Sequence, residues 1–240
     1  MSDTSVAGLA KSAATTIADS FGTTWAYLIL LTLCMLYAVG SDLPFAETSV
    51  WGGLISLSIL LLAFYTDWRI TRVYGHAKRP GSVLGWILWI IPVVLIGLTL
   101  DGLNEALPRG SSAEITGVPY WLRDSLFQAL IILISTPFLV MSTGRAIDAN
   151  GLEFSKLLDT GRNAMITAAI LLFAATFVLI FVDYAFLETQ QHSATSSSGI
   201  TPVSFASSIV ASLIWITQAG ITAVVYRHIE SAVITEGDRL

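Results

Sequence analysis

The sequence predicts an all-α membrane protein: a polytopic bundle of six transmembrane helices with short surface helices on the cytoplasmic side. Three observations predict this fold class. Hydrophobic residues make up 54% of the 240 residues and charged residues only 12%, whereas soluble domains carry about 25% charged residues. The apolar residues gather into six long runs separated by more polar segments. Basic residues concentrate in alternate segments between these runs, which is typical of multi-pass membrane proteins.

The first element, residues 1–23, is too polar to cross a membrane. Apolar residues recur in it at helical spacing, at Val6, Leu9, Ala13, Ile17 and Phe21. This spacing predicts a short helix that lies on the cytoplasmic membrane surface through one weakly apolar face. The alternative is a frayed chain end. A signal peptide is disfavoured because the single lysine of this segment is opposed by two aspartates.

The transmembrane domain is predicted over residues 24–226. Its six apolar runs are 24–39, 50–65, 83–100, 122–141, 164–186 and 203–226. A span needs about 20 apolar residues, so the first two runs depend on flanking aromatic residues at the membrane interface. Helices are expected because backbone polar groups must be satisfied within each span. Residues 227–240 are expected to form a cytoplasmic tail.

Two connections between the runs have features of their own. Residues 145–162 place leucines and Phe154 among charges after the turn dipeptide Asn150-Gly151. This pattern predicts a second surface helix that leads into the fifth span. Residues 189–202 are polar and low in complexity, and predict an exposed loop without regular structure.

The distribution of charge predicts the orientation. With both termini in the cytoplasm, the cytoplasmic segments hold ten of the twelve lysines and arginines, and the outer loops hold only Arg109 and Arg123 beside eight acidic residues. This bias follows the positive-inside rule. Single cysteines placed at Ser82 and Ser197 should therefore react with an impermeant thiol reagent from opposite sides of the membrane. Reaction of both from the same side would contradict this topology.

The segment 66–82 carries the densest group of basic residues. Each positive charge beside an anionic inner leaflet contributes about 1 kcal/mol, and aromatic side chains suit the headgroup level. The segment therefore predicts a site for lipid phosphates or for the acidic face of a partner protein, although the charges could also serve orientation alone. The candidate residues are Trp68, Arg69, Arg72, Tyr74, Lys78 and Arg79.

Composition argues against several function classes. A net charge of −5 provides no basic face for nucleic acid. The single cysteine, Cys34, permits no disulfide framework, and no histidine or cysteine cluster has metal-ligand spacing. No hydrolase or zinc-protease motif is present. We therefore expect a non-enzymatic membrane protein without metal or cofactor, which binds membrane lipids or a partner protein, for example as an accessory subunit of a membrane complex.

The alternative is a transporter or channel for a small solute. Two prolines interrupt apolar runs, as in the broken helices of transporters, and two glutamines are the deepest polar residues, although amides at this depth also join helices. The residues of this alternative site are Pro92, Gln128, Pro137 and Gln218. Four aspartates at the ends of the runs are interpreted as solvated boundary residues: Asp67, Asp101, Asp124 and Asp183. A third possibility is an intramembrane lipid enzyme.

Three segments of the chain carry a family resemblance. They are RVYGHAKRPGSVLGW at residues 72–86, Pro137 followed by LLDTGRN at residues 157–163, and YRHIESAVITEGDRL at residues 226–240. Together they resemble the six-span membrane domain associated with glycerophosphodiester phosphodiesterases and with related uncharacterised bacterial membrane proteins. The resemblance implies the fold and a location in the bacterial inner membrane. It implies no phosphodiesterase activity, because that chemistry belongs to a separate soluble barrel, and it carries over no catalytic residue.

Overall fold

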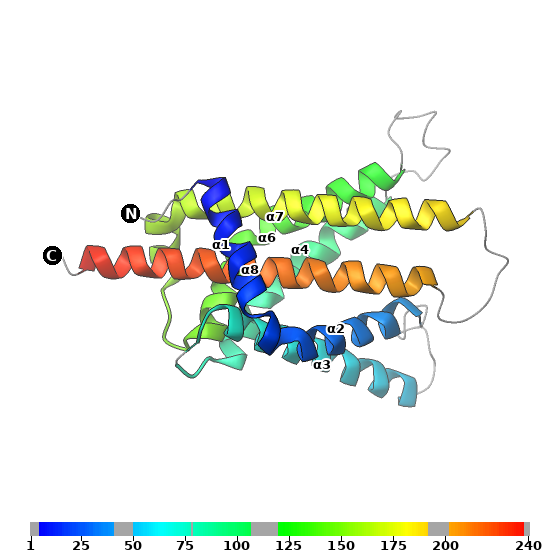
Figure 1. Cartoon of the computed structure of the whole chain (residues 1–240), viewed down its shortest axis with the longest axis horizontal. Helices are drawn as coiled ribbons and strands as arrows, with labels where there is room; N and C mark the ends of the chain where they lie inside the picture. The colour runs from blue at the N-terminus through cyan, green and yellow to red at the C-terminus, as the bar shows by residue number, and fades with distance from the viewer. Residues whose placement is uncertain (1–4, 41–49, 78, 107–119, 192–201, 238–240) are drawn as a thin grey trace.

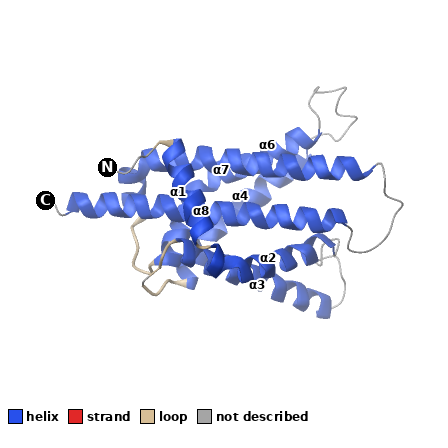
Figure 2. Ribbon diagram, in the orientation of Figure 1, coloured by secondary structure: helices blue, strands red, loops and turns tan. Residues whose placement is uncertain are grey.

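The computed structural model describes residues 5–40, 50–77, 79–106, 120–191 and 202–237. These residues form seven helices and no strand (Figure 2). The helices are α1 (Val6–Asp19), α2 (Phe21–Gly40), α3 (Val50–Tyr74), α4 (Val83–Ala106), α6 (Tyr120–Ile147), α7 (Phe154–Gln191) and α8 (Pro202–Gly237). The all-α fold class predicted from the sequence is confirmed.

Length and composition identify the membrane spans. Five helices, α3, α4, α6, α7 and α8, are each long and apolar enough to cross a membrane. Helices α1 and α2 pass the same test as a pair, although they are bent by 85° at the break between them. The described residues therefore form five candidate spans, or six if the bent pair is counted as one span, which agrees with a polytopic bundle.

Helix α1 forms where the apolar spacing predicted a surface helix. The Ser5 hydroxyl caps it by accepting a hydrogen bond from the Gly8 N–H at 3.1 Å. Its apolar face lies against the protein, because Leu9 and Ala13 are each only 4% exposed and α1 packs across α8 and α7 (Figure 1). The helix therefore covers part of the bundle at a steep angle to α2.

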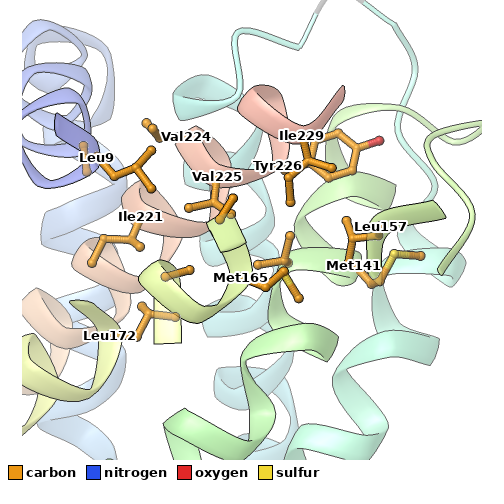
Figure 3. Packing of buried hydrophobic residues seen from close by; sticks show 14 of the residues in the cluster. Leu9, Met141, Leu157, Met165, Leu172, Ile221, Val224, Val225, Tyr226 and Ile229 are labelled. Carbon is orange, nitrogen blue, oxygen red and sulfur yellow. The ribbon is translucent and has the colours of Figure 1, made fainter. Parts of the chain in front are cut away.

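Helix α8 lies at the centre of the bundle. Of its candidate span, 61% is buried inside the protein, against 6% for α4. One core cluster joins α8 to α1, α6 and α7 around Tyr226 and Leu172, and Figure 3 shows its side chains converging between these helices. A second cluster joins α8 to α2 and α3 around Leu31 and Tyr74. Helix α4 packs mainly against α6, so most of its apolar surface is left for lipid.

Several helices extend beyond the predicted apolar runs. The helix predicted in 145–162 begins at Phe154, after the turn at Asn150-Gly151, and leads into the fifth span as one continuous helix, α7, whereas residues 145–147 belong to α6. Helix α7 also includes residues 189–191 of the predicted loop, and residues 192–201 lie outside the described part. Helix α8 continues through most of the predicted tail, to Gly237. Helix α3 continues to Tyr74 and so carries Arg69 and Arg72, which the sequence placed in a loop.

Two connections meet at the end of the bundle where α8 finishes (Figure 1). They are residues 75–82, of which 78 is not described, and residues 148–153. The Ser82 N–H donates to the Arg145 carbonyl at 2.9 Å, and the Ala149 N–H donates to the Pro80 carbonyl at 3.1 Å. These backbone bonds tie the α3–α4 connection to the last turn of α6 and to the α6–α7 connection.

Candidate functional site

The guanidinium of Arg72, predicted to bind lipid phosphate, instead forms hydrogen bonds with other groups of the protein. It donates to the Ala146 carbonyl at 2.7 Å and to the Arg79 carbonyl at 3.0 Å. The same group lies 5.1 Å from the ring centroid of Trp68, within the range of a cation–π contact. Arg72 therefore joins α3 to the last turn of α6 and to the connection 75–82, and its donors point at protein carbonyls.

Arg79 forms an ion pair with Asp148 across the two connections, with an Nη1–Oδ2 distance of 2.8 Å. Burial by itself raises the pKa of Asp148. Hydrogen bonds from Arg79 and from the Asn150 N–H, together with the positive charges of Arg79 and Arg145, lower this pKa by more than burial raises it. The pKa therefore lies below the usual aspartate value. A lowered carboxyl pKa stabilises the fold above the ordinary aspartate pKa, and this stability is lost as the pH falls through the lowered value. Because the Arg79 side chain is 75% exposed, solvent screens the pair.

The remaining residues of the predicted basic site are dispersed. Arg69 lies over the Tyr27 ring of α2, 5.7 Å from its centroid. Tyr74 is only 2% exposed and belongs to the second core cluster, so its side chain packs inside the protein. Trp68 is half-buried, and its indole nitrogen is buried without a hydrogen-bond partner among the described residues. Lys78 lies outside the described residues. The structure does not gather these side chains into one open cationic surface.

A central cavity of about 380 Å³ lies between α3, α4, α6, α7 and α8. Every residue that lines it falls within one of the five candidate spans. Its size is within the usual range for small-molecule sites. The cavity therefore lies among the candidate spans, where polar groups are costly unless they meet a partner.

The cavity wall contains a ring of polar side chains. Gln128 and Gln218, both predicted for the alternative transport site, line it. The Gln128 amide nitrogen donates to the Asp101 carboxylate at 2.8 Å, which fixes this side chain against α4. Among the described residues no hydrogen bond reaches the Gln218 amide. The Thr143 hydroxyl donates to the Thr222 hydroxyl at 2.9 Å and joins α6 to α8 in the same wall.

Asp67 also lines the cavity, and the sequence interpretation missed it. No hydrogen bond or ion pair to its carboxylate is found in the described part of the chain. Asp67 was taken for a boundary residue because the apolar run ends near Tyr65, but α3 continues for two more turns. The available signal was helical spacing, because Phe64, Asp67 and Thr71 share one face and all line the cavity.

Three aromatic side chains from three helices surround the same space. The Phe64 ring of α3 lies 6.0 Å from Trp86 of α4 in an edge-on arrangement, and 6.0 Å from Trp215 of α8. All three residues line the cavity. Phe64 lies one turn before Asp67, so the rings and the carboxylate belong to one site.

The two prolines of the predicted transport site do not line the cavity. Pro92 lies inside α4 and Pro137 inside α6, and both helices are continuous across them. The part of the prediction that places them around a central cavity is therefore wrong. Near Pro137, Phe138 stacks with Trp89 and Phe154 and packs α6 against α4 and α7.

An apolar groove of about 680 Å³ lies on the outer surface between α1, α7 and α8. Alanines such as Ala10, Ala14 and Ala174 line it with larger aliphatic residues, and Thr217 is the one polar lining residue in the described part of the chain. Within the described ranges no group of histidine, cysteine, aspartate or glutamate residues is arranged to hold a metal ion.

The chain was compared with protein-family models, curated proteins and solved structures. The predicted resemblance to a phosphodiesterase-associated membrane domain is not tested by them and stays a prediction. No family model matches this chain, and no curated protein or solved structure matches it either.

Proposed function

We propose that this multi-pass membrane protein binds a small solute in the central cavity and carries it across the membrane. The observation that supports this most is that two polar side chains without a hydrogen-bond partner among the described residues, Asp67 and Gln218, line a cavity between the candidate spans that is large enough for a solute. Ionisable groups within spans usually mark substrate or ion pathways. Binding sites in helical transporters also lie between spans near the membrane midplane.

The location that fits this function is the bacterial inner membrane, with both termini in the cytoplasm. The charge bias between the connecting segments supports this orientation. The hydrogen-bonded connections 75–82 and 148–153 would then face the cytoplasm, together with the end of α8.

A second candidate function is the one the composition favoured, binding of lipid or of a partner protein. The apolar groove between α1, α7 and α8 supports it, because its lining suits an acyl chain or an apolar helix. The basic residues support it less, since Arg72 and Arg79 are both engaged by the protein. This candidate predicts that filling the central cavity has no effect on function.

The solute-binding proposal predicts that filling the cavity abolishes binding. Ala211→Phe places a large side chain in the cavity wall of α8. The matched control is Leu213→Phe on the same helix, because Leu213 is 40% exposed at the outer surface and does not line the cavity. Each purified protein would be unfolded by heat with a panel of amines, amino acids, sugars and carboxylates. A ligand at 100 times its Kd stabilises the folded state by about 2.7 kcal/mol.

We expect at least one solute to raise the midpoint of the wild type and of Leu213→Phe, but not of Ala211→Phe. The same solute should enter proteoliposomes that contain the wild type. A solute that stabilises all three proteins equally, or a panel without any effect, would contradict binding in this cavity.

A further inference from the structure

We infer that the solute is a small organic cation, held by the Asp67 carboxylate against the rings of Phe64, Trp86 and Trp215. This inference rests on the proposed solute-binding function and adds the chemical class of the ligand. It depends on three features of the cavity: its charge, its aromatic wall and its polar acceptors.

The charge of the cavity has one sign. Among the described residues, Asp67 is the only acidic residue that lines the cavity, and no lysine, arginine or histidine lines it. Its carboxylate has no ion-pair or hydrogen-bond partner among the described residues. An unpaired carboxylate in a site of low dielectric is costly, so a ligand that brings one positive charge gains an interaction that a neutral or anionic ligand does not.

The aromatic wall favours a weakly hydrated cation. The Phe64 ring packs against Trp86 and against Trp215 at centroid distances of 6.0 Å each, and all three residues line the cavity. Aromatic faces attract ammonium groups within about 6 Å, and aromatic cages are a recurrent device for binding quaternary ammonium groups.

Polar acceptors and donors lie within the same cavity. Gln218 provides an amide without a protein partner in the described part of the chain, and Thr71 adds a hydroxyl group on the same face as Asp67. A ligand with an ammonium group at one end and a hydroxyl group at the other would match the Asp67 carboxylate with the first group and these polar side chains with the second. The inferred ligand class is therefore small alkyl-ammonium compounds with a polar end.

The test uses choline as the probe and 3,3-dimethyl-1-butanol as its uncharged control of the same shape. Binding to the full-length protein in detergent would be measured by isothermal titration and by tryptophan fluorescence, because Trp86 and Trp215 line the site. We expect choline to bind the wild type and the neutral analogue to bind on the order of tenfold more weakly or not at all.

Substitutions then assign the charge. Asp67→Asn keeps the size of the side chain and should weaken choline binding on the order of tenfold or more, whereas Asp67→Glu should restore part of it. The matched control is Asp183→Asn, because Asp183 also lies in a span but is held by Ser207 at 2.6 Å and does not line the cavity. Trp215→Leu should weaken choline more than the neutral analogue.

The outcomes separate this inference from the proposed function. If choline fails but a neutral or anionic solute of the panel binds in a manner that Ala211→Phe blocks, the cation inference is overturned and the proposed function stands. If choline binds equally to Asp67→Asn and to the wild type, the Asp67 carboxylate does not contribute to cation binding, and the inference is also overturned. If no solute binds, both fail.

Discussion

Gly144→Ala is expected to destabilise the bundle by about 1–3 kcal/mol. A Cβ atom at Gly144 would overlap the ring of Tyr226 on the facing helix α8. The ring cannot easily move, because Tyr226 is fully buried and its hydroxyl accepts a hydrogen bond from the Leu152 N–H at 3.1 Å. The contact therefore fixes both the packing of α6 on α8 and the position of the connection that precedes α7.

Thermal unfolding in detergent checks this expectation, with Gly102→Ala as the matched control. Gly102 also lies in a helix, but nothing would meet a Cβ atom there within 4 Å, and alanine favours helix over glycine. Gly102→Ala should leave the unfolding midpoint unchanged or raise it slightly. Tyr226→Leu in the Gly144→Ala background should cost less than Tyr226→Leu in the wild type. An unchanged midpoint for Gly144→Ala would show that the α6–α8 contact is looser than described.

Arg72→Gln should also destabilise the protein, by about 1–3 kcal/mol, because hydrogen bonds that involve a charged group are among the stronger ones. The substitution removes the bonds to the Ala146 and Arg79 carbonyls and the contact with the Trp68 ring. The connection 75–82 and the last turn of α6 should loosen, since Arg72 joins them to α3.

Arg79→Gln is the matched control for this prediction. It removes the same charge from the same segment but loses a single ion pair with Asp148, in which the arginine side chain is 75% exposed, so its effect should be smaller. Thermal unfolding and limited proteolysis of the connections would measure the difference. If both variants behave alike, Arg72 serves orientation or lipid binding, as the sequence predicted, and not the internal contacts.

Much of the fold could be predicted from the sequence because lipid imposes a simple rule on apolar runs. All six runs correspond to helices, and α1 forms where Leu9 and Ala13 recur at helical spacing. The ends of the helices were predicted less well. Helix α3 continues through Asp67 and Arg72 because its last turns are covered by other helices and by the connections, a tertiary contact that hydropathy does not report.

The candidate site was only partly predictable. Depth in an apolar run identified Gln128 and Gln218, which do line the cavity. The same criterion placed Asp67 at a boundary, because the apolar run ends just before it. Whether such a residue lines a cavity depends on the helices that surround it, which a single apolar run does not show. Prolines drew attention as helix breakers, but Pro92 and Pro137 are accommodated inside continuous helices. Tyr74 was expected at the headgroups because its burial under α8 cannot be seen from local sequence.

The central claim is that a water-accessible cavity lies inside the bundle, and the most direct measurement of it is the reactivity of single cysteines. Cys34 would first be replaced by serine, because it is the only cysteine of the chain. Cysteine would then be placed at Ala211, in the cavity wall, or at Leu213, on the lipid-facing side of the same helix. Thiols react as thiolates, which form readily only in contact with water.

A water-soluble methanethiosulfonate reagent should therefore modify the cysteine at position 211 much faster than the cysteine at position 213, and the Asp67 carboxylate should favour a positively charged reagent over a neutral one. Equal and slow modification at both positions would mean that the bundle is dry, and would contradict the account.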